Sequence, residues 1–395
     1  MAEPVLQEAP APVQAAAGDR AYQICSHCIM DTTDPEIRFD ERGVCMHCHT
    51  YDHLSAKLVR TGEEGRRALA AVVDEIKASG RGKPYDCVMG VSGGVDSTYV
   101  AYVAKELGLR PLAVHLDNGW DSELAVSNIE KVLRTLGIDL YTEVLDWEEF
   151  RDLQLSFLKA SVTDAEIPTD HAIGATVYRV AAARGIGFVI SGENVVTEGI
   201  LPGSWTYGVW DWKYIRGVHQ RYGTRRLRTF PHYSLARLFY YKSVRRTRTV
   251  RPLDYLPYVK EDVMQVLQDQ LGWKYYGGKH YESIYTRFFQ GYILPRKFGI
   301  DKRRAHLSTL ICSGQISREA ALTEMLCNSY SEDLQRQDRE YVIKKLALSP
   351  QEFEAIMASR VRTHRDYPNS SWVFRRARGL VRGARRLRLL PAGPI

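Results

Sequence analysis

The chain has 395 residues, of which 45% are hydrophobic and 26% are charged, and its formal net charge is +7. This length suffices for two or three domains with a buried core, and the composition is typical of a globular protein. No apolar run reaches the roughly 18 residues that a transmembrane helix needs, so the sequence predicts no membrane span. Residues 1–21 are rich in alanine and proline and lack the basic and apolar regions of a secretory signal. We therefore expect a disordered lead-in and a cytoplasmic protein.

Four of the seven cysteines form two Cys-x-x-Cys pairs. They are Cys25 with Cys28 and, after sixteen intervening residues, Cys45 with Cys48. Four thiolates at this spacing favour one tetrahedral zinc ion, so we predict a zinc ribbon at residues 22–55 that needs its metal to fold. Because four cysteines complete the coordination shell, the neighbouring histidines are expected beside the site or at the surface: His27, His47 and His49. Two redox-active pairs are the alternative interpretation.

Helix and strand patterns alternate from residue 60 onward. Gly65–Ser79 has apolar residues at helical spacing, and Gly80 ends this helix. The pattern continues as strand 85–91, helix 96–107, strand Leu112–Leu116, helix 122–136, strand Leu140–Leu145 and helix 147–160. This order is typical of βαβ units, so we predict an α/β domain at residues 60–255 with a parallel sheet and flanking helices. Ligands of such sheets bind beyond the carboxyl ends of the strands.

The first predicted strand leads through Ser-Gly-Gly-Val-Asp-Ser into a helix. Glycines let the backbone turn sharply and approach a ligand, and a helix start offers unpaired N–H groups to an anion. A carboxylate here is suited to hold magnesium on phosphates. We therefore predict a nucleotide phosphate site, with Asp96 as magnesium ligand, at Ser92, Gly93, Gly94, Val95, Asp96 and Ser97. The alternative is an ordinary turn before a helix.

Two further segments follow predicted strands and should reach the same edge of the sheet. The first supplies three candidate cofactor-binding residues: His115, Asp117 and Asn118. The second follows a strand that ends at Ile190, and it contains Gly192, Glu193 and Asn194. We predict that Gly192 contacts the cofactor and that Asn194 contacts the substrate. The resemblance of the Ser-Gly-Gly-Val-Asp-Ser loop to PP-loop enzymes implies that Glu193 binds magnesium together with Asp96. A solvated loop glutamate is the alternative for Glu193.

A third segment opens a predicted helix at Ala172–Ala183. Its candidate substrate-binding residues are Thr169, Asp170 and His171. The alternative for Thr169 or Asp170 is the N-cap of that helix.

The remaining chain is predicted to form a helical region at 256–365 and a basic tail at 366–395. The expected helices are Lys260–Leu271, Ile300–Ser313, Ser317–Asn328 and one that Ser349, Pro350 and Glu352 open with N-cap, N1 and N3 signals. Lys302 and Arg303 are predicted to neutralise departing pyrophosphate, and a solvated basic helix face is the alternative. The tail has seven arginines after Phe374 and no acidic residue. It could contact an anionic membrane or nucleic acid, or simply be solvated.

Residues 212–253 contain twelve Lys or Arg and no Asp or Glu, together with many aromatic residues. Three interpretations stay open: a nucleic-acid surface, a site for an acidic nucleotide-sugar, and a subunit interface.

In chain order the motifs are the four-cysteine ribbon, SGGVDS, HLDNGW, IPTDHAIG, SGEN and FGIDKRRAHLS. SGGVDS resembles the signature of the PP-loop ATP pyrophosphatases, whose fold is adenine nucleotide alpha-hydrolase-like. The whole order, over residues 22–330, resembles the N-acetyl sugar amidotransferase family of bacterial surface-glycan pathways (O-antigen, lipopolysaccharide or flagellin glycan). The resemblance implies conversion of an acetamido group on a nucleotide-linked or nonulosonic sugar to an acetamidino group. It implies ATP, Mg²⁺ and Zn²⁺ as cofactors and Asp96, Glu193 and Lys302 as catalytic residues.

The implied chemistry is activation of the amide oxygen by adenylylation, with loss of pyrophosphate, followed by attack of ammonia and loss of AMP. The resemblance also implies two partners, a glutaminase and an ammonia-conducting subunit similar to those of imidazole glycerol phosphate synthase. This chain lacks a recognisable glutaminase nucleophile, because position 2 is alanine and no glycine-flanked nucleophile turn surrounds Cys87, Cys312 or Cys327. Nucleic acid is not expected as a partner.

Two rival interpretations remain. A tRNA thiolation enzyme would combine the same loop with a ribbon, but sulfur transfer needs a reactive cysteine or an iron–sulfur cluster near the ATP site. A non-catalytic zinc-ribbon scaffold is the second rival.

Overall fold

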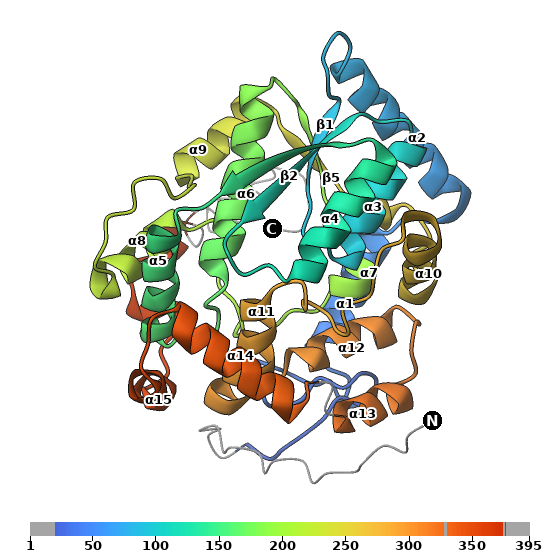
Figure 1. Cartoon of the computed structure of the whole chain (residues 1–395). Coiled ribbons are helices and arrows are strands. Elements are labelled where there is room, and N and C mark those ends of the chain that lie inside the picture. The colour runs from blue at the N-terminus through green and yellow to red at the C-terminus, as the bar shows by residue number, and fades with distance from the viewer. Residues whose placement is uncertain (1–19, 328–329, 374–375, 377–395) are drawn as a thin grey trace.

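The computed structural model describes residues 20–327, 330–373 and 376. At its centre lies a parallel five-stranded sheet in the order β3-β2-β1-β4-β5 (Figure 1). The strands are β1 (Cys87–Gly90), β2 (Pro111–Asp117), β3 (Asp139–Val144), β4 (Phe188–Ile190) and β5 (Arg248–Val250). The predicted parallel α/β fold is thereby confirmed. The predicted lead-in and most of the basic tail fall outside the described residues.

Strand side chains alternate between two helical layers, as the pleat requires. Val88 and Val189 pack on α6 (Ile167–Ala183), whereas Met89 and Ile190 face the opposite layer. The opposite layer consists of α2 (Gly62–Ser79), α3 (Val95–Glu106), α4 (Glu123–Leu136) and α10 (Lys260–Leu271). Figure 1 shows α6 on one side of the sheet and α3 with α4 on the other. Each fully buried Val, Leu or Ile stabilises this sandwich by about 1.5–3 kcal/mol.

The helix predictions are accurate where the apolar period is clear. α5 (Trp147–Ala160) and α10 have the predicted bounds, and α3 and α4 differ from them by one residue. The N-cap alternative for Thr169 or Asp170 is wrong, because α6 begins at Ile167 with Glu166 as its N-cap. Proline is tolerated in the first helical turn, where its missing N–H would have no partner.

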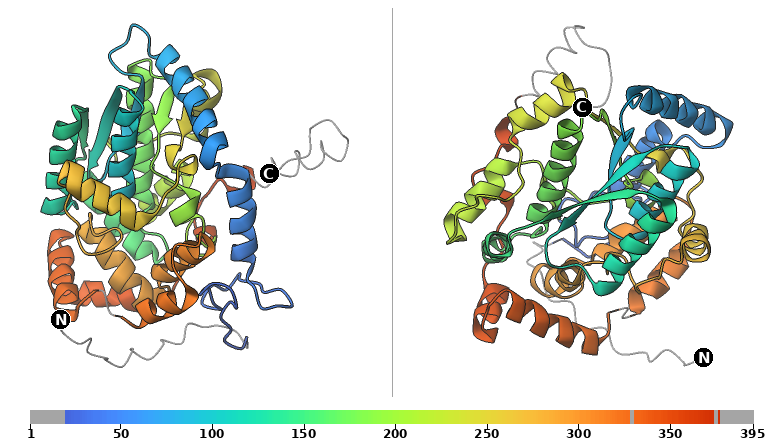
Figure 2. Two further views of the ribbon diagram at one scale, coloured as in Figure 1. Left: turned by 90° about the vertical axis from the view of Figure 1, so that its right-hand side faces the viewer. Right: turned by 45° about the horizontal axis from the view of Figure 1, so that its top comes forward.

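Most helices after α10 lie beneath the sheet in Figure 2, and α12 (Lys302–Cys312) and α13 (Arg318–Leu326) adjoin the cysteine ribbon. The remaining α-helices are α1 (Met46–Leu58), α7 (Val195–Glu198), α8 (Trp212–Tyr222), α9 (Leu235–Phe239), α11 (Ile284–Phe288), α14 (Glu332–Lys345) and α15 (Pro350–Ala358). Other helical turns are η1 (Tyr240–Val244), η2 (Pro252–Asp254), η3 (Phe289–Phe298) and η4 (His364–Asp366). The predicted helical C-terminal region is confirmed.

The core is not divided at residue 255, where the sequence suggested a boundary. Leu267 and Trp273 belong to the same buried cluster as Met89 and Ile190 of the sheet. α10 therefore packs as part of the sheet domain. Within the described part of the chain, no helix is both long and apolar enough to cross a bilayer.

Candidate functional site

The predicted phosphate loop lies where the order of the sheet changes direction. β2 and β3 extend the sheet on one side of β1, and β4 and β5 extend it on the other. Ligands of open parallel sheets bind at such a switch point, beyond the carboxyl ends of the strands. The loop after β4 reaches the loop after β1, since a Cβ on Gly192 would lie 3.1 Å from the Ser97 nitrogen. The structure thus brings together Gly192 and the start of α3.

The loop is held in shape by its own hydroxyl groups. Gly94 is the N-cap of α3, and its N–H donates to Ser92 Oγ at 3.3 Å. The Ser97 hydroxyl donates to the Gly94 carbonyl at 3.2 Å and lies 3.2 Å from Ser92 Oγ. Trp273 donates its indole N–H to the Gly93 carbonyl at 3.0 Å. These contacts preorganise the α3 N-terminus, whose N–H groups favour an anion.

Replacing Gly93 with alanine should disrupt this loop. Gly93 has φ of +78°, and a Cβ there would lie 2.8 Å from the Ala125 carbonyl oxygen, which belongs to the backbone of α4. Both the left-handed backbone and the clash oppose any side chain, so we expect a loss of about 2–3 kcal/mol. Chemical denaturation checks the change in stability. Gly137→Ala is the matched control, because Gly137 also has positive φ but a Cβ there would meet nothing within 4 Å.

Asp96 lies in the first turn of α3 and is half buried. Its carboxylate accepts a hydrogen bond from the Tyr258 hydroxyl. Desolvation and then repulsion from Glu198 raise the pKa of Asp96, against the attraction of Lys279. A carboxylate in this environment gains from a bound cation, which fits a magnesium ligand.

Glu193, the predicted magnesium partner of Asp96, is exposed in the loop after β4. Desolvation and repulsion from Glu198 also raise the pKa of Glu193. Glu198, at the end of α7, is thus an acidic neighbour of both residues, and the sequence analysis missed it. No group of three carboxylate or imidazole ligand atoms comes within 4.8 Å here among the described residues. Magnesium commonly takes only one or two carboxylates and completes its shell with water and phosphate.

A second missed element is the segment 273–284, which crosses the phosphate loop. A Cβ on Gly94 would lie 3.4 Å from the Tyr276 hydroxyl and 3.5 Å from Glu282 Oε1. Glu282 Oε2 is buried without a hydrogen-bond partner, as expected of a group that awaits a cation or water. The sequence signal was the turn sequence Tyr-Tyr-Gly-Gly-Lys-His at 275–280, in which basic and aromatic residues surround two glycines.

Two lysines from separate elements, Lys260 and Lys279, attract the Asp96 carboxylate. Lys279 forms an ion pair with Glu198 at 3.3 Å and lies 3.4 Å from His306 Nδ1. Burial and the charge of Lys279 lower the pKa of Lys260. The same causes, burial first and then the two lysines, hold the pKa of His306 well below its usual value, so this ring is neutral. Lys260 and Lys279 both act electrostatically on Asp96 and could therefore stabilise an anion bound at the phosphate loop.

The loop after β2 is fixed by the residues predicted to bind cofactor. His115 lies 3.0 Å from the Val91 carbonyl through Nδ1 and 3.3 Å from Asp121 through Nε2. Burial alone would lower the pKa of His115, but the hydrogen bonds to Asp121 and Val91 raise it. Asp117 and Asn118 accept hydrogen bonds from the backbone two residues on, and Asn118 Nδ2 donates to Thr169 Oγ1 at 3.3 Å. His115 thus braces the phosphate loop, and Asn118 connects this edge to α6.

Lys302 lies in an acidic group at the start of α6. Its ammonium is 3.4 Å from Glu166, and Asp164 and Asp170 also attract it. Burial would lower the pKa of Lys302, but these three carboxylates raise it. The structure therefore joins Lys302 to the predicted substrate residue Asp170. Desolvation by neighbouring groups is the main cause that raises the pKa of Asp170 to about 8, and repulsion from Asp164 and Glu166 adds to it. The residue is nevertheless exposed to solvent.

We expect Asp170→Asn to stabilise the protein increasingly as pH rises from about 4 to about 8. A carboxyl whose pKa is raised from 3.8 to about 8 keeps, when folded, a proton that the unfolded chain has released in this interval. The free energy of unfolding of the wild type therefore falls as pH rises from about 4 to about 8. Asparagine does not titrate, so the variant lacks this fall. Melting temperatures at pH 5, 7 and 9 check the slope. Asp74→Asn, an exposed position on α2, is the control, and equal slopes for both variants would contradict the prediction.

Three of the predicted site residues are turned to other partners. His171 is fully buried, with Nδ1 2.7 Å from the Val209 carbonyl and Nε2 accepting from the Tyr233 N–H at 3.3 Å. Burial lowers the pKa of His171 to about 4. Asn194 caps α7 by accepting from the Thr197 N–H at 2.8 Å. Arg303 pairs with Asp301 at 2.7 Å. The side chains of His171, Asn194 and Arg303 thus hold parts of the protein in place and do not face the phosphate loop.

The aromatic residues of the basic segment 212–253 pack largely within the protein. The Trp212 ring stacks on His232 with 4.2 Å between ring centroids, and Tyr214 is buried. Arg225 pairs with Glu148 at 2.8 Å, and Arg248 pairs with Glu75. These ring stacks and ion pairs explain much of the aromatic and basic content of residues 212–253 without requiring a ligand.

The four ribbon cysteines form one buried group. Their Sγ atoms lie within 4.8 Å of one another, and three of the pairs are 3.6–3.8 Å apart. Tetrahedral zinc with Zn–S bonds of about 2.3 Å requires S···S separations of about 3.8 Å. Backbone N–H groups of His27, Cys28 and Cys45 donate to Cys25 Sγ at 3.2–3.4 Å, which stabilises thiolate charge. The donor set and its geometry therefore suit zinc.

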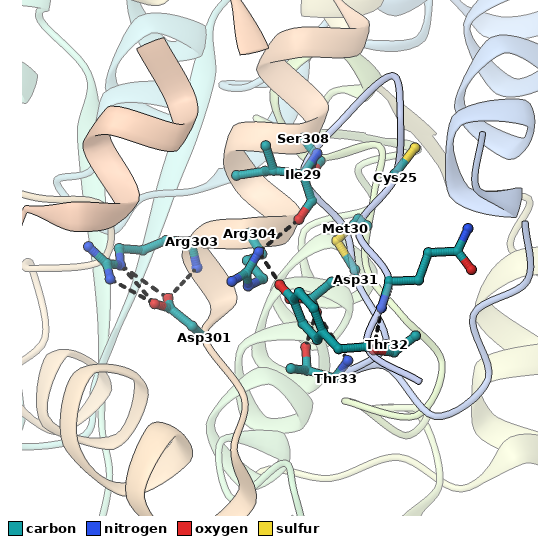
Figure 3. A network of polar contacts seen from close by, with 12 residues as sticks. Cys25, Ile29, Met30, Asp31, Thr32, Thr33, Asp301, Arg303, Arg304 and Ser308 are labelled. Carbon is teal, nitrogen blue, oxygen red and sulfur yellow. Dashed lines mark hydrogen bonds and ion pairs between the residues drawn. The ribbon is translucent and has the colours of Figure 1, made fainter. Parts of the chain in front are cut away.

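The ribbon docks on α12 through a polar network (Figure 3). Arg304 donates to the Ile29 carbonyl at 3.0 Å and pairs with Asp31 at 3.1 Å. The Ile29 N–H donates to Ser308 Oγ at 3.2 Å. Because α12 begins at Lys302, the ribbon helps to set the position of that residue.

The structure thus combines a parallel α/β sheet domain, with its candidate site at the switch point of the sheet, and an additional four-cysteine centre. Residues 282–378 match the family model described as LPS biosynthesis protein WbpG-like, C-terminal domain. This match includes the DKRRAHLS motif and extends beyond residue 330, where the sequence motifs ended. No curated protein matches the chain.

Three solved structures share weak likeness with this chain. An NH3-dependent NAD synthetase from Campylobacter jejuni has 13% identity and a TM-score of 0.27, covering 76% of this chain and 97% of that one. An NMN synthetase from Francisella tularensis has 15% identity and a TM-score of 0.27, with coverages of 47% and 73%. A predicted tRNA methyltransferase subunit from Methanocaldococcus jannaschii has 15% identity, the same TM-score and coverages of 46% and 76%. TM-scores this low support neither a detailed comparison of the folds nor an inference about function.

Proposed function

We propose that this protein is an ATP-dependent amidotransferase that converts an acetamido group of a sugar to an acetamidino group, with release of AMP and pyrophosphate. The observation that carries the proposal is the Ser-Gly-Gly-Val-Asp-Ser loop, which lies at the switch point of a parallel sheet with acidic and basic groups around Asp96. The lipopolysaccharide family matched by residues 282–378 supports a sugar substrate. The proposed place of action is the cytoplasm.

Separate groups bind the phosphates, stabilise the leaving pyrophosphate and hold the metal ion. The N–H groups at the start of α3 bind the phosphates of ATP, and Lys260 and Lys279 stabilise the charge that grows on the departing pyrophosphate. Asp96, with Glu193, Glu198 or Glu282, would hold magnesium, which supplies a Lewis acid for the phosphoryl oxygens. The amide oxygen of the sugar attacks the α-phosphorus, and the bond to pyrophosphate breaks.

The acidic group near Lys302 suits the second step. After adenylylation, ammonia attacks the imidate carbon, and AMP leaves with the former amide oxygen. The ionised form of a carboxyl with a pKa of about 8, such as that of Asp170, is a stronger base than an ordinary carboxylate and can accept the proton that the attacking nitrogen must lose. Thr169 and Asn118, joined by a hydrogen bond, flank this group and can contact the sugar.

Ammonia must come from elsewhere, because ammonium dominates at neutral pH and this chain shows no glutaminase motif. We propose a separate glutaminase with an ammonia-conducting subunit as partners. Zinc at the four cysteines would be structural.

Mass spectrometry of candidate nucleotide-sugars tests the proposal. The purified chain with ATP, magnesium and ammonium should lower the mass of the sugar by about one dalton as O is replaced by NH, and AMP should accumulate. Glutamine should not replace ammonium. Turnover of glutamine by the isolated chain would contradict the partner proposal, and ADP in place of AMP would contradict the mechanism. Stimulation of ATP cleavage by tRNA would favour the thiolation alternative.

A further inference from the structure

A second group of metal ligands adjoins the four-cysteine centre and shares one residue with it. Cys312, the last residue of α12, places its Sγ 3.8 Å from Cys48 Sγ. His27 places Nδ1 3.6 Å from Cys48 Sγ and 3.9 Å from Cys312 Sγ. Their three ligand atoms lie within 4.8 Å of one another, as do those of the four cysteines. The two groups have only Cys48 in common.

The distances fit a metal ion. Tetrahedral zinc with bonds of about 2.3 Å to sulfur and about 2.05 Å to nitrogen places two sulfurs about 3.8 Å apart and a nitrogen and a sulfur about 3.6 Å apart. The S···S and N···S separations of this group lie within about 0.3 Å of those values. Sulfur and imidazole ligands select zinc and similar soft ions over magnesium or calcium.

We propose that His27, Cys48 and Cys312 bind a second thiophilic divalent ion, with the Cys48 thiolate bridging it to the ion held by the four cysteines. His27 is exposed and Cys312 is half exposed, so water fills the fourth position. Binding releases one proton, from the Cys312 thiol, while His27 binds as the neutral imidazole. This inference concerns the metal content of the chain and stands apart from the proposed amidotransferase activity.

Charge balance favours the second ion. One divalent ion with four thiolates carries a net charge of −2, in a region where all four cysteines are buried. A second divalent ion and one more thiolate change that net charge to −1. Arg318, a cation beside the four cysteines, donates to the backbone carbonyls of Cys25 and Cys28 at 3.0 Å.

The competing arrangement has one ion, with Cys312 and His27 only hydrogen-bonded to the Cys48 thiolate. Titration of the metal-free full-length chain with Co²⁺ separates the two. We expect two equivalents, the second weaker because of its open position, each adding thiolate-to-cobalt absorption. Metal analysis after reconstitution with Zn²⁺ should likewise give two ions per chain.

Cys312→Ser and His27→Asn should each bind one equivalent fewer of Co²⁺ and keep the first. The first ion then reports that the ribbon is still folded. Cys327→Ser is the matched thiol control, because Cys327 is exposed and hydrogen-bonds to the Thr323 carbonyl, and His49→Asn is the matched imidazole control. Both controls should bind two. A single equivalent in the wild type, or two in Cys312→Ser, would overturn the proposal.

Discussion

Asp96→Asn should abolish the formation of AMP and pyrophosphate, with a loss of at least about 10²–10³-fold in rate. Asparagine has the same shape and still accepts a hydrogen bond from the Tyr258 hydroxyl, so the α3 N-terminus should keep its structure. It lacks the negative charge that holds a magnesium ion on the phosphates. The effect should appear in kcat more than in the affinity for the sugar, because the cation acts on charge that grows in the transition state.

A radiolabelled ATP assay with added ammonium measures this loss. Asp74→Asn on α2 removes an exposed carboxylate and should leave the rate unchanged. The melting temperature of Asp96→Asn should equal or exceed that of the wild type, since the fold raises the pKa of this carboxyl and so opposes its ionisation. An active Asp96→Asn enzyme would show that the Asp96 carboxylate is not the ligand that holds magnesium on the phosphates. Complementation by this variant in cells would favour the scaffold interpretation.

Removal of the metal from the four-cysteine centre should have the largest effect on stability. Structural zinc contributes about 10–16 kcal/mol of binding free energy in small metal-dependent modules. Without it the ribbon loses the contacts of Ile29 and Asp31 with α12. We expect Cys28→Ser, or treatment with a chelator, to lower the melting temperature by about 10 °C or more. Activity should fall as well, because α12 carries Lys302.

Calorimetry with parallel metal analysis checks this result. Cys327→Ser is the control and should change neither quantity. Zinc added back to the chelated wild type should restore both the melting temperature and the activity. A chelated protein that keeps its melting temperature would show that the ribbon is held by packing alone, and redox-active cysteines would then become the better interpretation.

The sequence predicted the regular parts of the sheet domain because their signals are local. The apolar run before Ser92 and the glycines after it define a strand and a turn through neighbours in the chain, and α5 follows directly from its period. The cysteine spacing predicted the ribbon for the same reason. The start of α6 was misplaced, since Pro168 and Thr169 resemble a helix boundary although they lie inside the first turn.

The site was predicted only in part because long-range packing determines it. Glu198, Lys260 and the segment that carries Lys279 and Glu282 all lie far from Asp96 in the sequence, and no local pattern connects them to it. His171 was predicted to bind substrate, but its ring is buried between Trp212 and Tyr233 and belongs to the core. Whether a histidine faces solvent or a core depends on the partners that fold over it, and those lie some forty or more residues away.

Hydrogen bonds hold both ends of the segment 273–284 in place, and they limit how often it can move aside for a ligand to pass. Trp273 is bonded to Gly93, Lys274 makes two hydrogen bonds with Asn128, and Ile284 donates to the Trp120 carbonyl at 2.9 Å. Breaking these four bonds to swing the segment aside costs about 1 kcal/mol each, so fewer than about one molecule in 500 is open at a given moment. Under the proposed function, exchange of nucleotide past this segment would be limited by the rarity of the open state, and solvent viscosity would slow turnover even with the bond-making steps unchanged.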